Sequence, residues 1–188
     1  MNFKRPLILA SKSPRRQQLL KDAGFTFDVK SREVDEAFPK HLPVQEVARY
    51  LATKKADAFT DELKDQVVIT ADTVVIIEEE ILEKPKDNQE AFEMLQKLSG
   101  KRHQVITGVC IKDQEKSVSF DDTTTVFFKQ LTEDEIKYYV NKFQPFDKAG
   151  AYGIQEWIGM IGIEQIEGSY FNVVGLPIHK VYAALMDF

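Results

Sequence analysis

The sequence predicts an α/β fold with a mixed sheet, arranged as two lobes around a cleft. Strand-like and helix-like segments alternate in the early part of the chain, which is typical of strands joined by helices that cover a sheet. Two long segments rich in Val, Ile, Thr and Phe then follow one another, which indicates a hairpin and therefore a mixed sheet. In such folds, ligand sites gather at the carboxyl ends of strands and at helix N-termini.

The first elements are predicted as strand, helix, strand and helix. Residues 6–10 (PLILA) predict a short buried strand, and the SKSP that follows predicts a helix with Ser13 as its N-cap and proline at its first position. Gly24 is expected to end this helix, since glycine tolerates the left-handed conformation there. The alternating residues 25–31 predict a second strand, and residues 43–60 a second helix.

The later elements are predicted from capping signals and from apolar runs. Asp87 and Thr132 are each followed three positions later by Glu, a capping-box pattern that marks a helix start. Gly100 and Pro145 are expected to end these two helices. The remaining predictions are strands at 67–77, 80–85, 103–112, 117–128 and near 158–166, and a last helix over 176–188.

Composition narrows the function classes. A net charge of −5 argues against broad electrostatic binding to duplex nucleic acid, although a local basic pocket stays possible. The single cysteine excludes an intramolecular disulfide and a four-cysteine zinc site, and the three scattered histidines lack ligand spacing. The apolar run near the N-terminus is too short for a signal peptide or a membrane span, so we expect a cytoplasmic protein that does not insert into membranes.

An acidic residue interrupts the most strand-like segment, VVITADTVVII at 67–77. Burial of an ionised carboxylate without partners costs several kcal/mol. Asp72 is therefore expected to be neutral, paired, at a strand end that faces a cleft, or bound to a metal. The residues alone leave two hypotheses open: a structural ion pair and a working acid.

A second segment that could carry chemistry is SKSPRR, where a strand turns into a helix. Free N–H groups at the helix N-terminus, the hydroxyl of Ser11 and the guanidinium groups of Arg15 and Arg16 could together bind phosphate. The alternative is an ordinary capped helix with solvated arginines. The chain contains neither a Walker loop nor a G-x-G-x-x-G pattern, which argues against kinase-type and dinucleotide-binding proteins.

Three further residues could complete a site. A hairpin would place Lys84 on the strand next to Asp72, where it could balance the carboxylate or hold a phosphate. Glu36 and Asp72 together would offer hard oxygen ligands suited to Mg²⁺ or Mn²⁺. The amide of Gln155 matches the O4 acceptor and N3–H donor of uracil or thymine. A buried ion pair, a solvated loop and a surface glutamine are the respective alternatives.

Taken together, the ordered motifs resemble the Maf (septum-formation) family of nucleoside triphosphate pyrophosphatases, which are related to ITPase-like enzymes. The likeness extends over nearly the whole chain. It rests on LASKSPRRQQLL, VDE, LATKKA, TADTVV, LEKP, LSG, HQVITGV, DKAGAYGIQ and GSY followed by VVGLP. The LASxSPRR start together with DKAGAYGIQ is similar to the branch that acts on dTTP and UTP.

The resemblance implies an elongated ITPase-like α/β fold with helices on both sides of the sheet, formed by residues 1–188 as one domain and paired as a homodimer. It implies hydrolysis of a nucleoside triphosphate, dTTP and UTP above all and modified pyrimidine nucleotides as further substrates, to the monophosphate and pyrophosphate. That activity would serve as nucleotide-pool house-cleaning. The alternative is a nucleotide-dependent regulatory binding protein that acts in septum formation or division arrest.

The resemblance also assigns roles to individual residues. Asp72 matches the family's catalytic acid, a proton acceptor, and Glu36 is expected beside it as a second catalytic group and metal ligand. Asp72 is a candidate for both the base and the metal ligand, with Mg²⁺ or Mn²⁺ as the expected cofactor. One departure is Glu79, which stands where relatives often have glycine. The substrate-binding residues implied are Arg15, Thr73 and Gln155 for pyrimidine choice, and Ser11, Arg16, Lys55 and Lys84 in the polar pocket.

Overall fold

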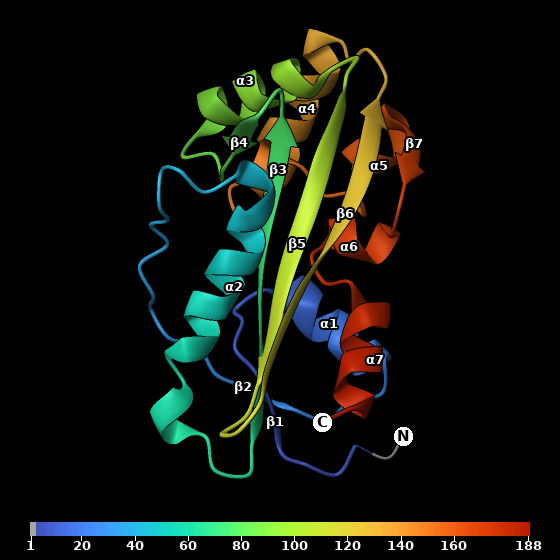
Figure 1. The fold of residues 1–188 in the computed structure, drawn as a ribbon. Coiled ribbons are helices and arrows are strands. Elements are labelled where there is room, and N and C mark those ends of the chain that lie inside the picture. The colour runs from blue at the N-terminus through green and yellow to red at the C-terminus, as the bar shows by residue number, and fades with distance from the viewer. Residues whose placement is uncertain (1–2) are drawn as a thin grey trace. The chain divides into compact units, whose positions relative to one another are not determined.

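Helices and strands alternate along the chain as predicted for an α/β protein (Figure 1). The computed structural model describes residues 3–188. Within that range the strands form one seven-stranded sheet in the order β2-β1-β3-β5-β6-β7, with β4 paired to β3. The strands are β1 (Leu7–Leu9), β2 (Asp28–Val29), β3 (Val67–Ile77), β4 (Glu80–Leu82), β5 (Arg102–Lys112), β6 (Ser117–Phe128) and β7 (Ile163–Glu167).

The sheet is mixed, which confirms the predicted class. Strand β1 runs parallel to β2 and β3, whereas β4 is antiparallel to β3 and β7 is antiparallel to β6. None of the helices within residues 3–188 has the length and apolar character to cross a membrane. The helices are α1 (Pro14–Asp22), α2 (Val47–Asp57), α3 (Asn88–Leu98), α4 (Glu133–Phe143), α5 (Trp157–Gly162), α6 (Tyr170–Val174) and α7 (Ile178–Met186), with single 3₁₀ turns at Val44–Glu46, Thr60–Glu62 and Ala149–Ala151.

The chain divides into two compact units. The first contains the chain up to Asp72 together with Thr107–Asp122 and Gly175–Phe188, and the second contains Thr73–Ile106 and Thr123–Val174. The prediction that a cleft lies between two lobes stays a prediction.

The first unit buries its core around strands β1, β3 and β5. Leu9, Ile69 and Val109 are fully buried there, together with Leu20 of α1 and Leu185 of α7. These residues come from the short apolar runs that the sequence marks as strands and from the apolar stripes of the two helices. Burial of each such side chain contributes about 1.5–3 kcal/mol.

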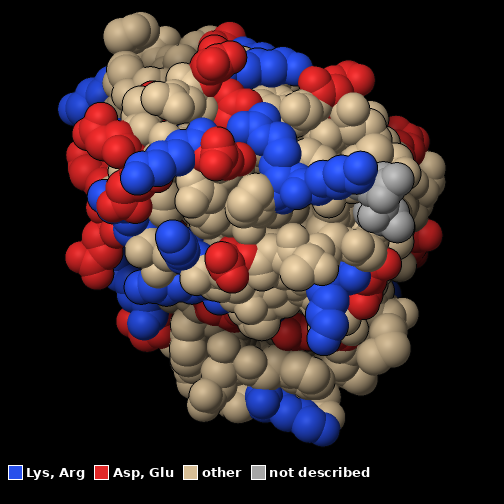
Figure 2. Space-filling view, turned by 90° about the horizontal axis from the view of Figure 1, so that it is seen from below, with Lys and Arg blue, Asp and Glu red and all other residues tan. Residues whose placement is uncertain are grey.

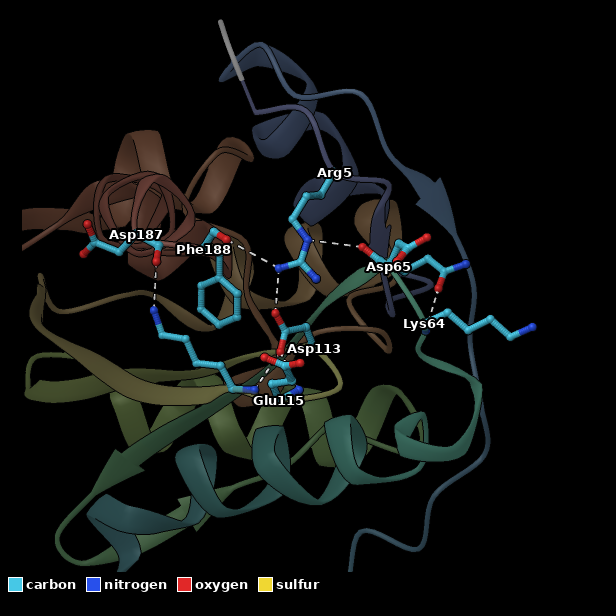
Figure 3. Close-up of polar contacts among 9 residues, drawn as sticks. Arg5, Lys64, Asp65, Asp113, Glu115, Asp187 and Phe188 are labelled. Atoms are coloured by element: carbon cyan, nitrogen blue, oxygen red, sulfur yellow. Dashed lines mark hydrogen bonds and ion pairs between the residues drawn. The ribbon is translucent and has the colours of Figure 1, made fainter.

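Arg5 joins separate segments of the first unit by hydrogen bonds. Figure 3 shows its side chain pointing toward the turn between β5 and β6 and toward the C-terminus. Its Nη1 donates to Asp113 Oδ2 at 2.6 Å and to the carbonyl of Phe188 at 3.4 Å, and its Nε donates to the carbonyl of Asp65 at 3.2 Å. Asp113 also accepts from the backbone N–H of Lys116. One side chain thus links segments that are far apart in the sequence.

The predicted capping signals are confirmed. Ser13 Oγ accepts a hydrogen bond from the backbone N–H of Arg16 at the start of α1, and Asp87 caps α3 in the same way. Thr132 and Glu135 form a reciprocal capping box at α4. Gly24 and Gly100 adopt φ values of +84° and +68°, the left-handed conformation that ends a helix at low cost in glycine.

Three predicted strands differ from the structure, and one of them is the strand expected over 80–85, which shortens to β4. The strand expected near 158–166 is wrong in its first half: Trp157–Gly162 forms helix α5, and β7 covers only Ile163–Glu167. The physical reason is Gly159, because a Cβ there would lie 1.9 Å from the carbonyl oxygen of Ile154. Its absence permits a tight helical turn that packs backbone against backbone. The strand expected over 25–31 shortens to β2, whose two residues are exposed.

Glu79, which stands where relatives often have glycine, lies in the turn between β3 and β4. Ile77 pairs with Glu80, so Glu78 and Glu79 form a two-residue hairpin loop. Their φ values are +51° and +62°, as the favoured hairpin turn requires at both positions. Glycine adopts this conformation without the roughly 1–2 kcal/mol penalty of a left-handed L-residue.

The second unit contains a buried histidine. His103 in β5 is 2% exposed, and its Nε2 lies 2.7 Å from the hydroxyl of Tyr152. Its ring stacks on Phe128 with centroids 5.5 Å apart. Burial lowers the pKa of His103 from 6.5 to about 3, so the folded protein holds this imidazole in the neutral form at neutral pH.

Because His103 stays neutral in the folded protein, we expect the protein to lose stability as the pH falls below about 6.5. Between about pH 6.5 and pH 3 the unfolded chain binds a proton at His103 that the folded chain does not, so stability falls by about 1.4 kcal/mol per pH unit from this residue. We expect the free energy of unfolding of His103→Gln to fall by about 2 kcal/mol less than that of the wild type between pH 6.5 and about pH 4.5. Chemical denaturation at these two pH values measures the difference.

The exposed His41 supplies the matched control for this measurement. His41→Gln should leave the pH-dependent decline as in the wild type. Equal declines in His103→Gln and the wild type would contradict the neutral, buried state of His103.

Candidate functional site

Asp72 lies in the middle of strand β3, where the apolar run is interrupted. Residues 67–71 and 74–77 are buried, whereas Asp72 and Thr73 are partly exposed. The strand does not end at the acid, because its later residues pair with β4. The side chain of Asp72 is 15% exposed. The carboxylate is therefore neither sealed in the core nor fully solvated.

Lys55 is the direct partner of this carboxylate. Its Nζ lies 2.5 Å from Asp72 Oδ1 and 2.7 Å from Glu36 Oε1. One ammonium group thus lies between two carboxylates, within the first unit. The lysine side chain is 20% exposed and that of Glu36 is 57% exposed, so the cluster runs from a partly buried acid to an exposed one.

The packing of α2 on the sheet brings Lys55 to Asp72. Thr70 Oγ1 donates to the carbonyl of Ala52 at 2.6 Å. Alternate residues of a strand share a face, so Thr70 and Asp72 both point toward α2, whereas Thr73 points to the other face. On the helix, residues three apart lie on one side, so Ala52 and Lys55 meet these two strand residues.

Gly108 of β5 allows α2 to lie this close to the sheet. A Cβ at this position would be 2.3 Å from the carbonyl carbon of Ala48 and 2.3 Å from the backbone nitrogen of Arg49. Both atoms belong to the helix backbone, which cannot move aside as a flexible side chain could. The missing side chain therefore sets the depth of α2, and with it the position of Lys55.

The VDE segment, residues 34–36, is held against α2 and places Glu36 in the cluster. Asp35 Oδ1 accepts from the N–H of Ala37 at 3.0 Å, and Asp35 Oδ2 pairs with Lys54 at 3.4 Å. Lys54 also donates to the carbonyl of Ala37. Two neighbouring acids thus bind two neighbouring lysines of α2, and the hydrogen bond from Ala37, followed by the charge of Lys54, lowers the pKa of Asp35.

Arg16 connects α1 to the backbone beside Asp72. Its Nε donates to the carbonyl of Gly175 at 2.7 Å, and its Nη1 donates to the carbonyl of Ala71 at 2.8 Å. Burial lowers the pKa of Arg16, while attraction by Asp72 acts in the opposite direction. The guanidinium thus anchors the strand residue that precedes the acid.

The other two predicted residues of the SKSPRR segment lie at the start of α1. Ser11 is buried, and its Oγ accepts from the backbone N–H of Ser13 at 3.2 Å. Its carbonyl accepts from the side chain of Gln17. Arg15 is partly buried in the first turn of the helix.

The cluster around Lys55 offers a metal ion the carboxylates of Asp72 and Glu36. No group of three or more His, Cys, Asp or Glu residues arranged to hold a metal occurs among the described residues. The cluster nevertheless contains two carboxylates and one ammonium group, so a further cation would be attracted to it. Mg²⁺ commonly binds through one or two carboxylates and completes its shell with phosphate oxygens and water. The donor set therefore fits a divalent cation that arrives with a phosphorylated ligand.

The three remaining predicted residues belong to the second unit. Thr73 continues β3 after the acid and is partly exposed. Lys84 is exposed and lies beyond the β3–β4 ladder, which ends at the pair of Val75 and Leu82. The prediction that Lys84 lies on the strand next to Asp72 is therefore wrong, whereas its role in holding a phosphate stays a prediction. Gln155 is exposed directly after buried residues 150–154.

Sequence reasoning missed the side chains that surround the segment before Gln155. Tyr139 of α4 donates to Glu156, and Lys148 pairs with Glu156 at 3.0 Å. Lys148 and Glu156 lie in or beside the DKAGAYGIQ motif, so their proximity could have been suspected. Tyr139 follows the apolar period of α4, and nothing in that pattern distinguishes it from an ordinary core residue.

The chain matches a protein-family model described as "Maf-like protein" over residues 6–188. A protein named dTTP/UTP pyrophosphatase from Flavobacterium psychrophilum is 52% identical over 96% of this chain and 93% of its own length. Proteins of the same name from Christiangramia forsetii and Bacteroides thetaiotaomicron are 50% and 48% identical, over 96% and 95% of this chain and 93% and 94% of their own lengths.

A solved structure is similar in fold. The Ham1 protein of Staphylococcus aureus superposes with a TM-score of 0.55 over 97% of this chain and 99% of its own, at 18% sequence identity. This likeness confirms the predicted mixed-sheet α/β fold.

The contacts of Arg16 predict that lysine cannot replace it. Lys retains the charge but lacks the fork that reaches the carbonyls of Gly175 and Ala71 together. Arg16→Lys should lower the free energy of unfolding by about 1–3 kcal/mol, measured by chemical denaturation. Arg102→Lys, at an exposed position of β5, is the control and should change stability by less than about 0.5 kcal/mol. Equal stabilities of the two variants would contradict the anchoring role of Arg16.

Proposed function

This chain belongs to the Maf family, and we propose on that premise that it hydrolyses dTTP and UTP to the nucleoside monophosphate and pyrophosphate. The full-length relatives that carry this activity in their name support the proposal. The structural observation that carries it is the partly exposed carboxylate of Asp72, held at 2.5 Å by Lys55. A pure binding protein has no need of a carboxylate positioned in this way. The activity is that of a hydrolase in nucleotide-pool house-cleaning, and modified pyrimidine nucleotides are proposed as further substrates.

Asp72 acts as the proton acceptor in the proposed mechanism. Its carboxylate orients a water molecule and takes its proton as the water oxygen attacks the α-phosphorus. The bond between the α-phosphorus and the bridging oxygen breaks, and pyrophosphate leaves. Lys55 fixes the direction of this carboxylate, and Glu36 is the second acid of the centre.

Cationic and polar side chains bind the triphosphate in this proposal. Arg15 and Lys84 hold phosphate oxygens through charge-assisted hydrogen bonds, and the N-terminus of α1 adds N–H groups beside Ser11. Lys55 compensates the negative charge that accumulates in the transition state. Arg16 contributes its positive charge while its Nε and Nη1 hold the backbone.

We propose a divalent cation, Mg²⁺ or Mn²⁺, as cofactor, with Asp72 and Glu36 as its protein ligands. When bound, the cation supplies charge neutralisation for the phosphate oxygens. The two carboxylates around Lys55 support this assignment.

Gln155 and Thr73 select the pyrimidine in this proposal, together with Arg15. The amide of Gln155 donates to O4 and accepts from N3–H of uracil or thymine. The exposed position of Gln155 at the end of a buried segment supports this role.

We further propose that residues 1–188 act as one catalytic domain, that the protein is a cytoplasmic homodimer, and that it binds no duplex nucleic acid. On the face drawn in Figure 2, Lys and Arg side chains are interspersed with Asp and Glu. This mixture and the net charge of −5 support the last point, because duplex binding depends on neutralisation of many phosphates.

Asp72→Asn tests the assignment of the base. The amide keeps the size of the side chain but cannot take a proton from water, so pyrophosphate release from dTTP should fall by about 100-fold or more. Asp57→Asn on α2, which removes an exposed surface pair with Lys112, is the control and should retain wild-type turnover. The assay is pyrophosphate release with and without Mg²⁺ or Mn²⁺, with circular dichroism to confirm folding.

Near wild-type turnover in Asp72→Asn would overturn the base assignment. Stoichiometric binding of nucleotide by the wild type without turnover would instead favour the alternative of a regulatory binding protein in septum formation.

Gln155→Glu tests base selection. A carboxylate cannot donate to O4, so kcat/KM for dTTP and UTP should fall by about 10-fold or more. Gln66→Glu, which keeps the acceptor for the N–H of Lys64, should behave as the wild type. Unchanged kinetics of Gln155→Glu across a panel of nucleoside triphosphates would refute the assignment.

A further inference from the structure

The segment that ends at Gln155 is unusually constrained. Residues 150–154 are buried, although they form an irregular connection. Gly150 and Ala151 both have positive φ, +68° and +60°. A left-handed conformation is unfavourable for alanine and persists only where the surroundings enforce it. A Cβ at Gly150 would lie 2.9 Å from a methyl carbon of Val75, so the backbone is pressed against β3.

A closed ring of hydrogen bonds holds the end of this segment. The N–H of Gly153 donates to the hydroxyl of Tyr139 at 3.1 Å, and this hydroxyl donates to the carboxylate of Glu156. The N–H of Glu156 returns to the carbonyl of Gly153 at 3.0 Å. Residues 153–156 are thereby tied at both ends, with Gln155 between the ties.

Lys148 completes the arrangement. It is 8% exposed, and its Nζ contacts Glu156 Oε1 at 3.0 Å and Asp147 Oδ1 at 2.7 Å. A Cβ at Gly153 would lie 3.0 Å from carbon atoms of both Lys148 and Glu156, so these side chains close directly over the glycine. Burial and the hydrogen bond to Glu156 raise the pKa of Tyr139, so its hydroxyl stays protonated and able to donate.

A glutamine side chain by itself does not distinguish uracil and thymine from cytosine. Rotation of its terminal amide by half a turn exchanges the donor and the acceptor. The rotated amide matches the amino group and N3 of cytosine as well as the original matches uracil and thymine. Preference for dTTP and UTP therefore requires that the surroundings restrict the side chain of Gln155, and a fixed backbone is the first requirement for that.

We propose that Glu156, clamped by Tyr139 and Lys148, is a positioning residue that gives the enzyme its preference for uracil and thymine over cytosine. It acts by fixing the backbone from which Gln155 projects. The inference rests on the proposed function, in which Gln155 contacts the base. In this proposal Tyr139 and Glu156 act on the base through Gln155.

Tyr139→Phe tests this clamp by removing a single oxygen atom. We expect the ratio of kcat/KM for dTTP to that for dCTP to fall by about 5-fold to 10-fold, the effect of one lost hydrogen bond. Tyr138→Phe is the matched control, because its hydroxyl accepts from Lys142 on the exposed side of the same helix and its ring contact with Trp157 is kept. The control should preserve the ratio.

Hydrogen exchange of the Gly153 amide provides a second readout, which should become faster in Tyr139→Phe and stay unchanged in Tyr138→Phe. If Tyr139→Phe does not fold, Glu156→Gln decides by the same ratio, because the amide keeps the shape but loses the charge that holds Lys148.

The outcomes separate the two proposals. A wild type that does not prefer dTTP and UTP over dCTP overturns the proposed function and this inference with it. A selective wild type whose Tyr139→Phe and Glu156→Gln variants keep the full ratio overturns this inference alone. An equal loss of activity toward every nucleotide, with the ratio unchanged, also overturns it, since that is the effect of a merely structural role.

Discussion

The ion pair of Asp72 with Lys55 is the interaction on which the candidate site depends. A carboxylate in the middle of a largely buried strand is costly unless a charge of opposite sign meets it, and Lys55 meets it at 2.5 Å. The pair in turn requires that α2 lie directly on the sheet. Gly108 permits that approach, and the hydrogen bond from Thr70 to Ala52 holds it. An apparently ordinary glycine in β5 thus determines where α2 can bring Lys55 to Asp72.

Both units support their polar residues in the same way. In the first, Arg16 donates to two backbone carbonyls, that of Ala71, which precedes Asp72, and that of Gly175. In the second, Tyr139 and Lys148 hold Glu156, which holds the backbone before Gln155. In each case a partly or fully buried polar side chain stabilises main-chain atoms rather than a ligand. Such support matters because binding and catalysis lose efficiency when a group is misplaced by about 1 Å.

Local patterns predicted much of the fold. Strand β3 has the predicted bounds, and Ser13, Asp87 and Thr132 cap helices as their spacing indicates. The failure near residues 158–166 is equally instructive. An apolar run that contains Gly159 has the composition of a strand, yet contact of its backbone with Ile154 decides for a helix. Short apolar runs do not distinguish the two states by period alone, and tertiary contacts settle them.

The sequence by itself determined the α/β class, most element boundaries and the family, because these follow from local spacing and ordered motifs. Only the tertiary structure decided that Asp72 lies within a strand and not at its end, that Lys55 bridges it to Glu36, and that Arg16 binds backbone. It also revealed Tyr139 beneath the segment that ends at Gln155. These contacts join residues far apart in the chain, and the packing distance between elements is not written in any local pattern.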